Sequence, residues 1–226
     1  MVDERPIDGR RWGEWVGGGH ERWEVVRRSW LIFQRNTTEL MNLLNAPAND
    51  PLFALQLMND DAEASPFWEE LDQRLHNQLS SAVSLVAHTG RLLKYYEADF
   101  PAVVAEYRSR NDAIMGMDET AFLRHLRNYL LKYGVPPIIQ TLHLRPAKGS
   151  TSGHLLKLSA EHLLKWDEWK VQARGYLESF GDRDGPVIGR DVVAYANAMS
   201  GLFTWLFQQR LGVMRENIPD RFRMDA

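Results

Sequence analysis

Residues 65–97, SPFWEELDQRLHNQLSSAVSLVAHTGRLLKYYE, carry the pattern that decides the fold class. A serine followed by a proline opens the stretch, which is a common helix start, because serine caps the first turn and proline fits its first position. Apolar side chains then recur every four residues, at Phe67, Leu71, Leu75 and Leu79. Such a repeat lines one face of a helix. The stretch therefore predicts a long amphipathic helix over about 66–97.

Helical periodicity also occurs on both sides of this stretch, bounded by glycine, proline or capping residues. It predicts further helices over about 21–44, 51–59, 101–115, 119–133, 160–179 and 190–216. The pattern changes to alternation over 138–144, and a second short apolar run at 154–158 follows a turn-rich stretch, which together predict two short strands. The sequence therefore predicts a mainly α protein, a helical bundle with a short β-hairpin insertion at about 138–158.

A single domain accounts for most of the chain. The first twenty residues are rich in glycine, arginine and tryptophan. Three consecutive glycines at 17–19 are unfavourable in a helix, because glycine loses the most backbone freedom on folding. We therefore expect a flexible arm over 1–20, one helical domain over 21–217, and a frayed tail over 218–226.

The composition excludes several classes of function. The 226 residues carry a net charge of -3, so there is no overall basic field of the kind that nucleic-acid binders often show. Cysteine is absent, which rules out disulfides, cysteine-ligated metal and a thiol nucleophile. No apolar run approaches the roughly 20 residues of a membrane span, and the N-terminus lacks the apolar core of a signal peptide. We therefore expect a cytoplasmic protein with no membrane partner.

No metal or cofactor site is predicted. None of the seven histidines has another histidine four residues away, and there is no His-Glu-x-x-His motif. His143 and His154 could face each other across the predicted hairpin, but exposed residues at the strand ends are the favoured interpretation. Two tryptophans three residues apart, Trp166 and Trp169, are expected to pack in the core or at an interface.

The most basic helix end in the chain lies in residues 122–136, FLRHLRNYLLKYGVP. An amphipathic helix there carries Arg124, His125, Arg127 and Lys132, and a glycine and a proline terminate it. Cationic side chains gathered in this way suit the phosphate groups of a nucleic acid. An ordinary cationic last turn, which interacts favourably with the helix dipole, is the alternative.

This segment resembles the signature of the HEPN superfamily, in which an arginine, often followed by asparagine, precedes a histidine by four to six residues. Arg127-Asn128 matches the first half of that motif. The resemblance extends over about 66–216, with the signature region at 119–136. It implies a small helical domain, often a homodimer, acting on RNA without a metal in defence or toxin–antitoxin systems.

Carried over residue by residue, the resemblance implies a catalytic set of Arg127, Asn128 and Lys132. It implies a nucleic-acid-binding set of Arg124, Arg127 and Lys132. The chain departs from the motif at Lys132, which stands where the family has its histidine. A lysine with an ordinary pKa near ~10.4 is a poor general base at neutral pH, although it can bind phosphate.

His125 does not simply replace the missing histidine, because two residues along an ideal helix separate it from Arg127 by about 160°. We therefore expect a HEPN-like, RNA-associated protein with a degraded ribonuclease site, and whether it is an enzyme stays open. A non-catalytic helical dimerisation or interaction module is the alternative. A third interpretation is an active ribonuclease with a rearranged base.

Overall fold

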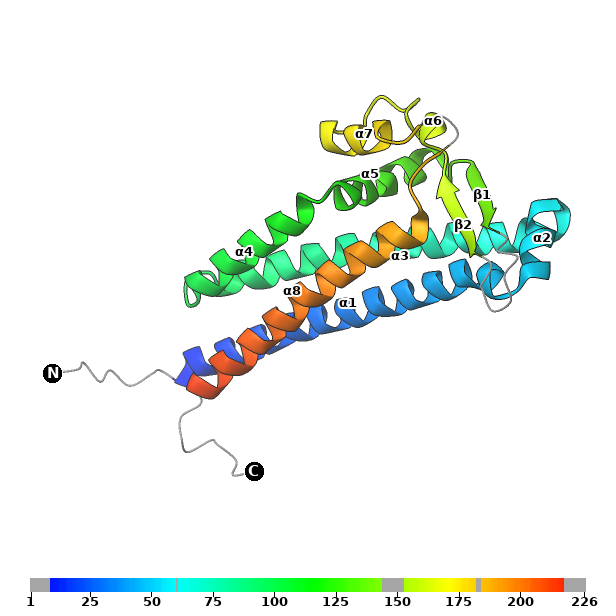
Figure 1. Ribbon diagram of the computed structural model, residues 1–226. Coiled ribbons are helices and arrows are strands. Elements are labelled where there is room, and N and C mark those ends of the chain that lie inside the picture. The colour runs from blue at the N-terminus through cyan, green and yellow to red at the C-terminus, as the bar shows by residue number, and fades with distance from the viewer. Residues whose placement is uncertain (1–8, 60, 144–152, 182–183, 218–226) are drawn as a thin grey trace.

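The computed structural model describes residues 9–59, 61–143, 153–181 and 184–217, and shows a bundle of helices with one small sheet. Three long helices run along the molecule: α1 (Gly9–Asn49), α3 (Asp61–Tyr96) and α8 (Ile188–Asn217) (Figure 1). A two-stranded antiparallel sheet lies near one end of the bundle. The prediction of a mainly α bundle with a short hairpin is confirmed.

The shorter elements are placed around the three long helices. α4 (Pro101–Met115) and α5 (Asp118–Tyr133) follow one another along α3, and α2 (Pro51–Asn59) lies at the end near the sheet (Figure 1). Short helices α6 (Ala160–Leu163) and α7 (Val171–Glu178) lie over α5 on the side away from α1.

The first helix begins earlier than the sequence predicts. α1 starts at Gly9, so residues 9–20 of the predicted flexible arm are helical and the three glycines lie inside the helix. Each glycine costs about 1 kcal/mol relative to alanine in a helix. Extending an existing helix is far easier than nucleating one, and the buried Trp23 and Val26 anchor the next turns. Residues 1–8 and the predicted tail 218–226 lie outside the described residues.

Two prolines that the sequence analysis treats as boundaries lie inside helices. Pro47 stands within the last turn of α1, and Pro66 is the sixth residue of α3. A proline removes one backbone donor but keeps a helical φ, and both prolines lie within two turns of a helix end. The helices therefore extend a few residues beyond the predicted limits near these positions.

The predicted helix over 160–179 is instead two helices, α6 and α7, separated by residues 164–170. The indole N–H of Trp169 donates to the Leu163 carbonyl oxygen at 2.7 Å, just where α6 ends. The rings of Trp166 and Trp169 meet edge to face with centroids 4.8 Å apart, and both are buried. Both tryptophans are buried from within this irregular segment, so their predicted place in the core is confirmed.

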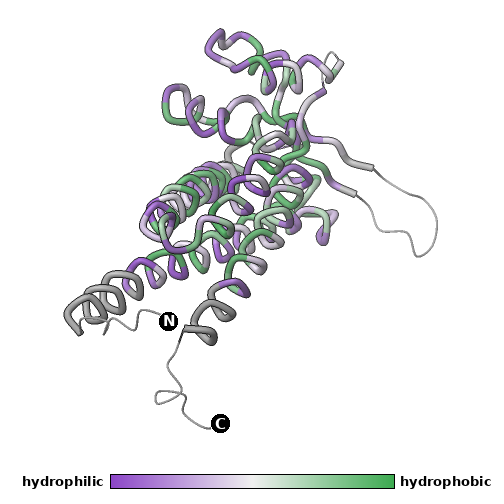
Figure 2. Tube along the Cα trace, turned by 90° about the vertical axis from the view of Figure 1, so that its left-hand side faces the viewer, coloured by the Kyte–Doolittle hydropathy of each residue, from purple (hydrophilic) through white to green (hydrophobic). Residues whose placement is uncertain are grey.

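Aromatic packing joins the long helices. The ring of Trp30 on α1 stacks on Phe203 of α8 with centroids 5.1 Å apart, and Phe33 meets Tyr195 edge to face. Figure 2 shows hydrophobic stretches concentrated where the helices meet, with hydrophilic ones toward the outside. None of the helices in the described part of the chain is both long and apolar enough to cross a membrane.

The hairpin connects α5 to the later helices. Strands β1 (Ile138–His143) and β2 (Gly153–Leu158) pair with Ile138 opposite Leu158. The Leu158 N–H donates to the Pro186 carbonyl at 3.0 Å, and an isolated bridge joins Lys157 to Val187. The segment that leads into α8 is thus held against β2, which sets where α8 starts.

Candidate functional site

The candidate site is on α5, which packs between two different sets of neighbours. Buried apolar residues such as Phe122, Leu126 and Leu130 line its inner side. Gly134, at φ 77°, ends the helix in a backbone conformation that favours glycine. Because the helix is held along α3 on one side and α7 on the other, its polar side chains are divided between separate openings.

One opening is a cleft of about 620 Å³ between α5 and the segment that joins α6 to α7. Three polar side chains of α5 line it, His125, Asn128 and Lys132. The joining segment contributes Trp166, Asp167, Glu168, Trp169 and Lys170. Two of the three predicted catalytic residues, Asn128 and Lys132, are therefore brought together here.

Lys132 is held by an acidic partner across the cleft. Its Nζ donates to the Glu168 carboxylate at 2.6 Å and lies 5.6 Å from the centroid of the Trp166 ring. The hydrogen bond to Glu168 raises the pKa of Lys132 above its ordinary value. Lys132 therefore stays protonated at neutral pH, which suits binding of an anion and does not suit general-base catalysis.

His125 has the opposite character. Burial lowers the pKa of His125, and the positive charges of Arg124 and Lys170 lower it further. Its ring is neutral at pH 7 and meets Trp169 edge to face, with centroids 6.4 Å apart. Because seven residues make nearly two full turns, His125 and Lys132 share one face of α5. The i, i+3 and i, i+7 spacing of His125 with Asn128 and Lys132 is the sequence signal that identifies it as a cleft residue.

The two arginines lie elsewhere. Arg127 does not line the cleft, and its Nε is buried with no hydrogen-bond partner among the described residues. Arg124 lines a separate cavity between α5, α3 and α8. The predicted nucleic-acid-binding set of Arg124, Arg127 and Lys132 is therefore spread over three environments, and only Lys132 faces the cleft.

Within the part of the chain that the structure describes, no group of three histidine, aspartate or glutamate side chains is arranged to hold a metal ion. The cleft offers two cations, two carboxylates, an amide and a neutral imidazole. These groups can bind a polar, partly anionic ligand and exchange a proton at His125.

A second polar cluster was missed by the sequence analysis. Asp191, only 2% exposed, accepts a hydrogen bond from the Tyr176 hydroxyl at 2.8 Å and another from Arg190 Nε at 3.1 Å. Burial raises the pKa of Asp191, and the two hydrogen bonds act against that shift. Because every partner belongs to α7 or α8, this cluster joins those two helices.

Comparison with known proteins adds no relative: no family model, no curated protein and no solved structure matches this chain.

Proposed function

We propose that this chain is a HEPN-like, non-catalytic domain that binds RNA at the α5 cleft. The observation that carries the proposal is the grouping of Asn128 and Lys132 with Lys170 around one open cleft. Single-stranded RNA is bound through phosphate contacts from cations and hydrogen bonds from amides. The cleft supplies both on an accessible surface.

Lys132 carries the phosphate-binding part of the proposal. Its side chain is 47% exposed and that of Glu168 is 54% exposed, so their ion pair is a surface pair that contributes little to stability. An incoming phosphate replaces Glu168 as the partner of the ammonium group at small cost. Glu168 thus limits RNA affinity, and its removal is expected to strengthen binding.

The non-catalytic part follows from proton chemistry. Cleavage by attack of a 2′-hydroxyl needs a base whose pKa lies near the working pH. The raised pKa of Lys132 takes it further from that range. Arg127, the arginine of the motif, does not face the cleft, so the phosphate-binding and proton-transfer groups of the family are not assembled within one protomer.

Salt-dependent RNA binding tests the binding proposal. The affinity for labelled mixed-sequence RNA should fall in Lys132→Gln and Lys170→Gln, each of which should reduce the slope of log K against log salt by about 0.7. Glu168→Gln should increase the affinity, because it releases Lys132 and removes a negative charge. Lys94→Gln, which alters an exposed lysine near the end of α3, is the matched control and should bind like wild type. An RNA affinity that does not change with salt concentration or with any of the three cleft substitutions would refute the proposal.

Cleavage in EDTA tests the loss of catalysis. Wild type and Arg127→Ala should leave labelled RNA intact, whereas Lys132→His should gain cleavage if the family motif maps onto this position. Cleavage by wild type that leaves cyclic-phosphate ends would show an active ribonuclease. His125→Ala would then decide whether the neutral imidazole in the cleft supplies the base.

A homodimeric interaction module is the second candidate, and the surface of α2 favours it. This nine-residue helix carries no charge and exposes three large apolar side chains on one face, Leu52 at 74%, Leu55 at 42% and Met58 at 46%. Exposed apolar groups of this kind mark interfaces, and pairing with a second copy buries the same face twice. Light scattering should show a concentration-dependent dimer that Leu52→Glu abolishes; a monomer at all concentrations would exclude this candidate.

A further inference from the structure

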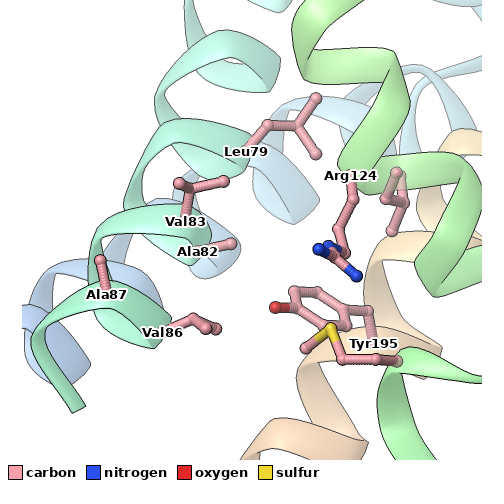
Figure 3. Close-up of a pocket in the computed structure, with 9 residues that line it drawn as sticks. Leu79, Ala82, Val83, Val86, Ala87, Arg124 and Tyr195 are labelled. Atoms are coloured by element: carbon pink, nitrogen blue, oxygen red, sulfur yellow. The ribbon is translucent and has the colours of Figure 1, made fainter. Parts of the chain in front are cut away.

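A cavity of about 210 Å³ lies on the other side of α5 from the cleft, between α3, α5 and α8. One wall is formed by apolar side chains of α3: Leu79, Ala82, Val83, Val86 and Ala87. Figure 3 shows Val83 and Val86 directed from α3 toward the space that Arg124 and Tyr195 border from the opposite side. Val83 and Ala87 are exposed, so the cavity opens to solvent along α3.

Two polar groups face this apolar wall. Arg124 of α5 directs its guanidinium toward Tyr195 of α8 (Figure 3). Neither side chain has a hydrogen-bond or ion-pair partner among the residues that the structure describes, although most other arginines there are paired. A cation without an anion, placed beside a phenol and an apolar surface, is arranged to receive one.

Tyr195 acts as a hydrogen-bond donor at this site. Its side chain is only 4% exposed, and burial raises its pKa to about 12 while the charge of Arg124 acts in the opposite direction. The hydroxyl therefore keeps its proton at any physiological pH. Its ring is fixed by an edge-to-face contact with Phe33 of α1, with centroids 5.9 Å apart.

We propose that this cavity binds a small aliphatic carboxylate. The carboxylate accepts charge-assisted hydrogen bonds from the Arg124 guanidinium and a further one from the Tyr195 hydroxyl, and the hydrocarbon tail lies against the apolar wall of α3. Ligand sites typically combine a largely apolar surface with a few polar groups that fix orientation. A guanidinium matches the two oxygens of a carboxylate in geometry and charge.

The size of the cavity limits the ligand. Sites for drug-sized ligands occupy about 300–1,000 Å³, and this cavity is smaller. A medium-chain fatty acid fits such a space, whereas a nucleotide does not, and the α3 wall offers no partner for the hydroxyls of a sugar. This binding site is separate from the proposed RNA-binding cleft, because Arg124 lines the cavity but not the cleft, and Lys132 lines the cleft but not the cavity.

Calorimetric titration of the full chain with three probes tests the proposal. Octanoate provides both the charge and the tail, acetate provides the charge alone, and octanol provides the tail alone. Octanoate should bind saturably. Octanol should bind at least about tenfold more weakly, because it lacks the charge-assisted hydrogen bonds. Acetate should also bind at least about tenfold more weakly, because it lacks the hydrocarbon tail whose burial favours binding. The same order should appear in the rise of the melting temperature with ligand.

Variants identify the site. Arg124→Gln should weaken octanoate binding about tenfold or more, and Tyr195→Phe should weaken it by a smaller factor while it keeps the ring packed on Phe33. Arg28→Gln, which removes another exposed arginine from α1, is the matched control and should leave binding unchanged. The proposal is overturned if octanoate does not bind saturably, if acetate binds as well, or if Arg124→Gln binds like wild type. None of these results depends on whether the protein binds RNA.

Discussion

Single residues of α5 have different chemistry depending on which neighbour they face. Lys132 and His125 share one cleft, yet their pKa values are shifted in opposite directions. The hydrogen bond to Glu168 raises the pKa of Lys132 and keeps it protonated, whereas burial lowers the pKa of His125 and keeps it neutral. Arg124 is one position before His125 and faces a different cavity. A local sequence of four basic residues is therefore not one basic surface, and each must be tested against its own ligand.

His154 provides a prediction at this scale. It is 5% exposed, its Nε2 lies 3.2 Å from the Gln140 Oε1, and its Nδ1 is buried without a partner. Burial lowers the pKa of His154 below its ordinary value. A group whose folded pKa is depressed contributes stability that is present above the unfolded pKa, near ~6.5, and is lost as the pH falls below it.

Urea unfolding between pH 7 and pH 5 measures this effect. The wild type should lose stability as the pH falls, and His154→Gln should lose less, because glutamine does not titrate. His125 has a depressed pKa as well, so the variant keeps part of the pH dependence. Equal pH dependence in wild type and variant would show that His154 titrates alike in the folded and unfolded chain. The buried position of His154 also shows that its interpretation as an exposed strand-end residue is wrong.

Elements were predictable where their ends are marked locally. α5 ends at Gly134, whose positive φ favours glycine, and the hairpin strands follow from alternation and a turn-rich connection. The break between α6 and α7 has no such local marker. It depends on packing of Trp166 and Trp169 against rings of α5, where Trp169 stacks 6.0 Å from Tyr129, and a single-sequence pattern does not contain that contact.

Gly185 gives a prediction for the junction between β2 and α8. A Cβ at this position would lie 1.8 Å from the Leu158 carbonyl oxygen and 3.0 Å from the Ala160 nitrogen, which are both backbone atoms. The backbone must move to accept it, so Gly185→Ala should lower the free energy of unfolding by about 1–3 kcal/mol. The midpoint of urea unfolding measures the loss.

Gly175 in α7 is the matched control for that substitution. A Cβ there meets nothing within 4 Å, and the residue lies inside a helix. Gly175→Ala should therefore stabilise the protein by about 0.5–1 kcal/mol, since alanine is the better helix former. If both variants shifted the midpoint in the same direction, the close approach of Gly185 to β2 would not be the cause.

At the scale of the whole molecule, the candidate site is divided because of how α5 is packed. The sequence pattern predicts a candidate site on α5 in which Arg124, Arg127 and Lys132 form one patch, whereas the structure spreads these three side chains over separate environments. Small differences in angle around a helix become large differences in environment when the helix is enclosed on two sides by α3 and α7. Which opening each side chain lines is thus determined by the packing of the assembled bundle and not by the α5 sequence alone.

The aromatic contact between α1 and α8 gives a prediction about the stability of the whole bundle. Phe203 is fully buried and stacks on Trp30 at 5.1 Å, and these two helices come from opposite ends of the chain. Phe203→Ala should lower the free energy of unfolding by about 3–5 kcal/mol, because it removes a large buried ring and leaves a cavity. The adjacent exposed residue provides the control: Thr204→Ala should change it by about 0.5 kcal/mol or less.

Two probes of urea unfolding decide whether that contact stabilises the molecule as one unit. Circular dichroism follows the helices, and fluorescence follows the eight tryptophans, which include Trp30 on α1 and Trp166 beside α5. If the bundle is cooperative, both signals should change together, and Phe203→Ala should shift both midpoints equally. If only one signal shifts, the molecule does not unfold as one unit. A locally unfolding unit around α5 and α7 would contain the cleft, and ligand binding there would stabilise that unit alone.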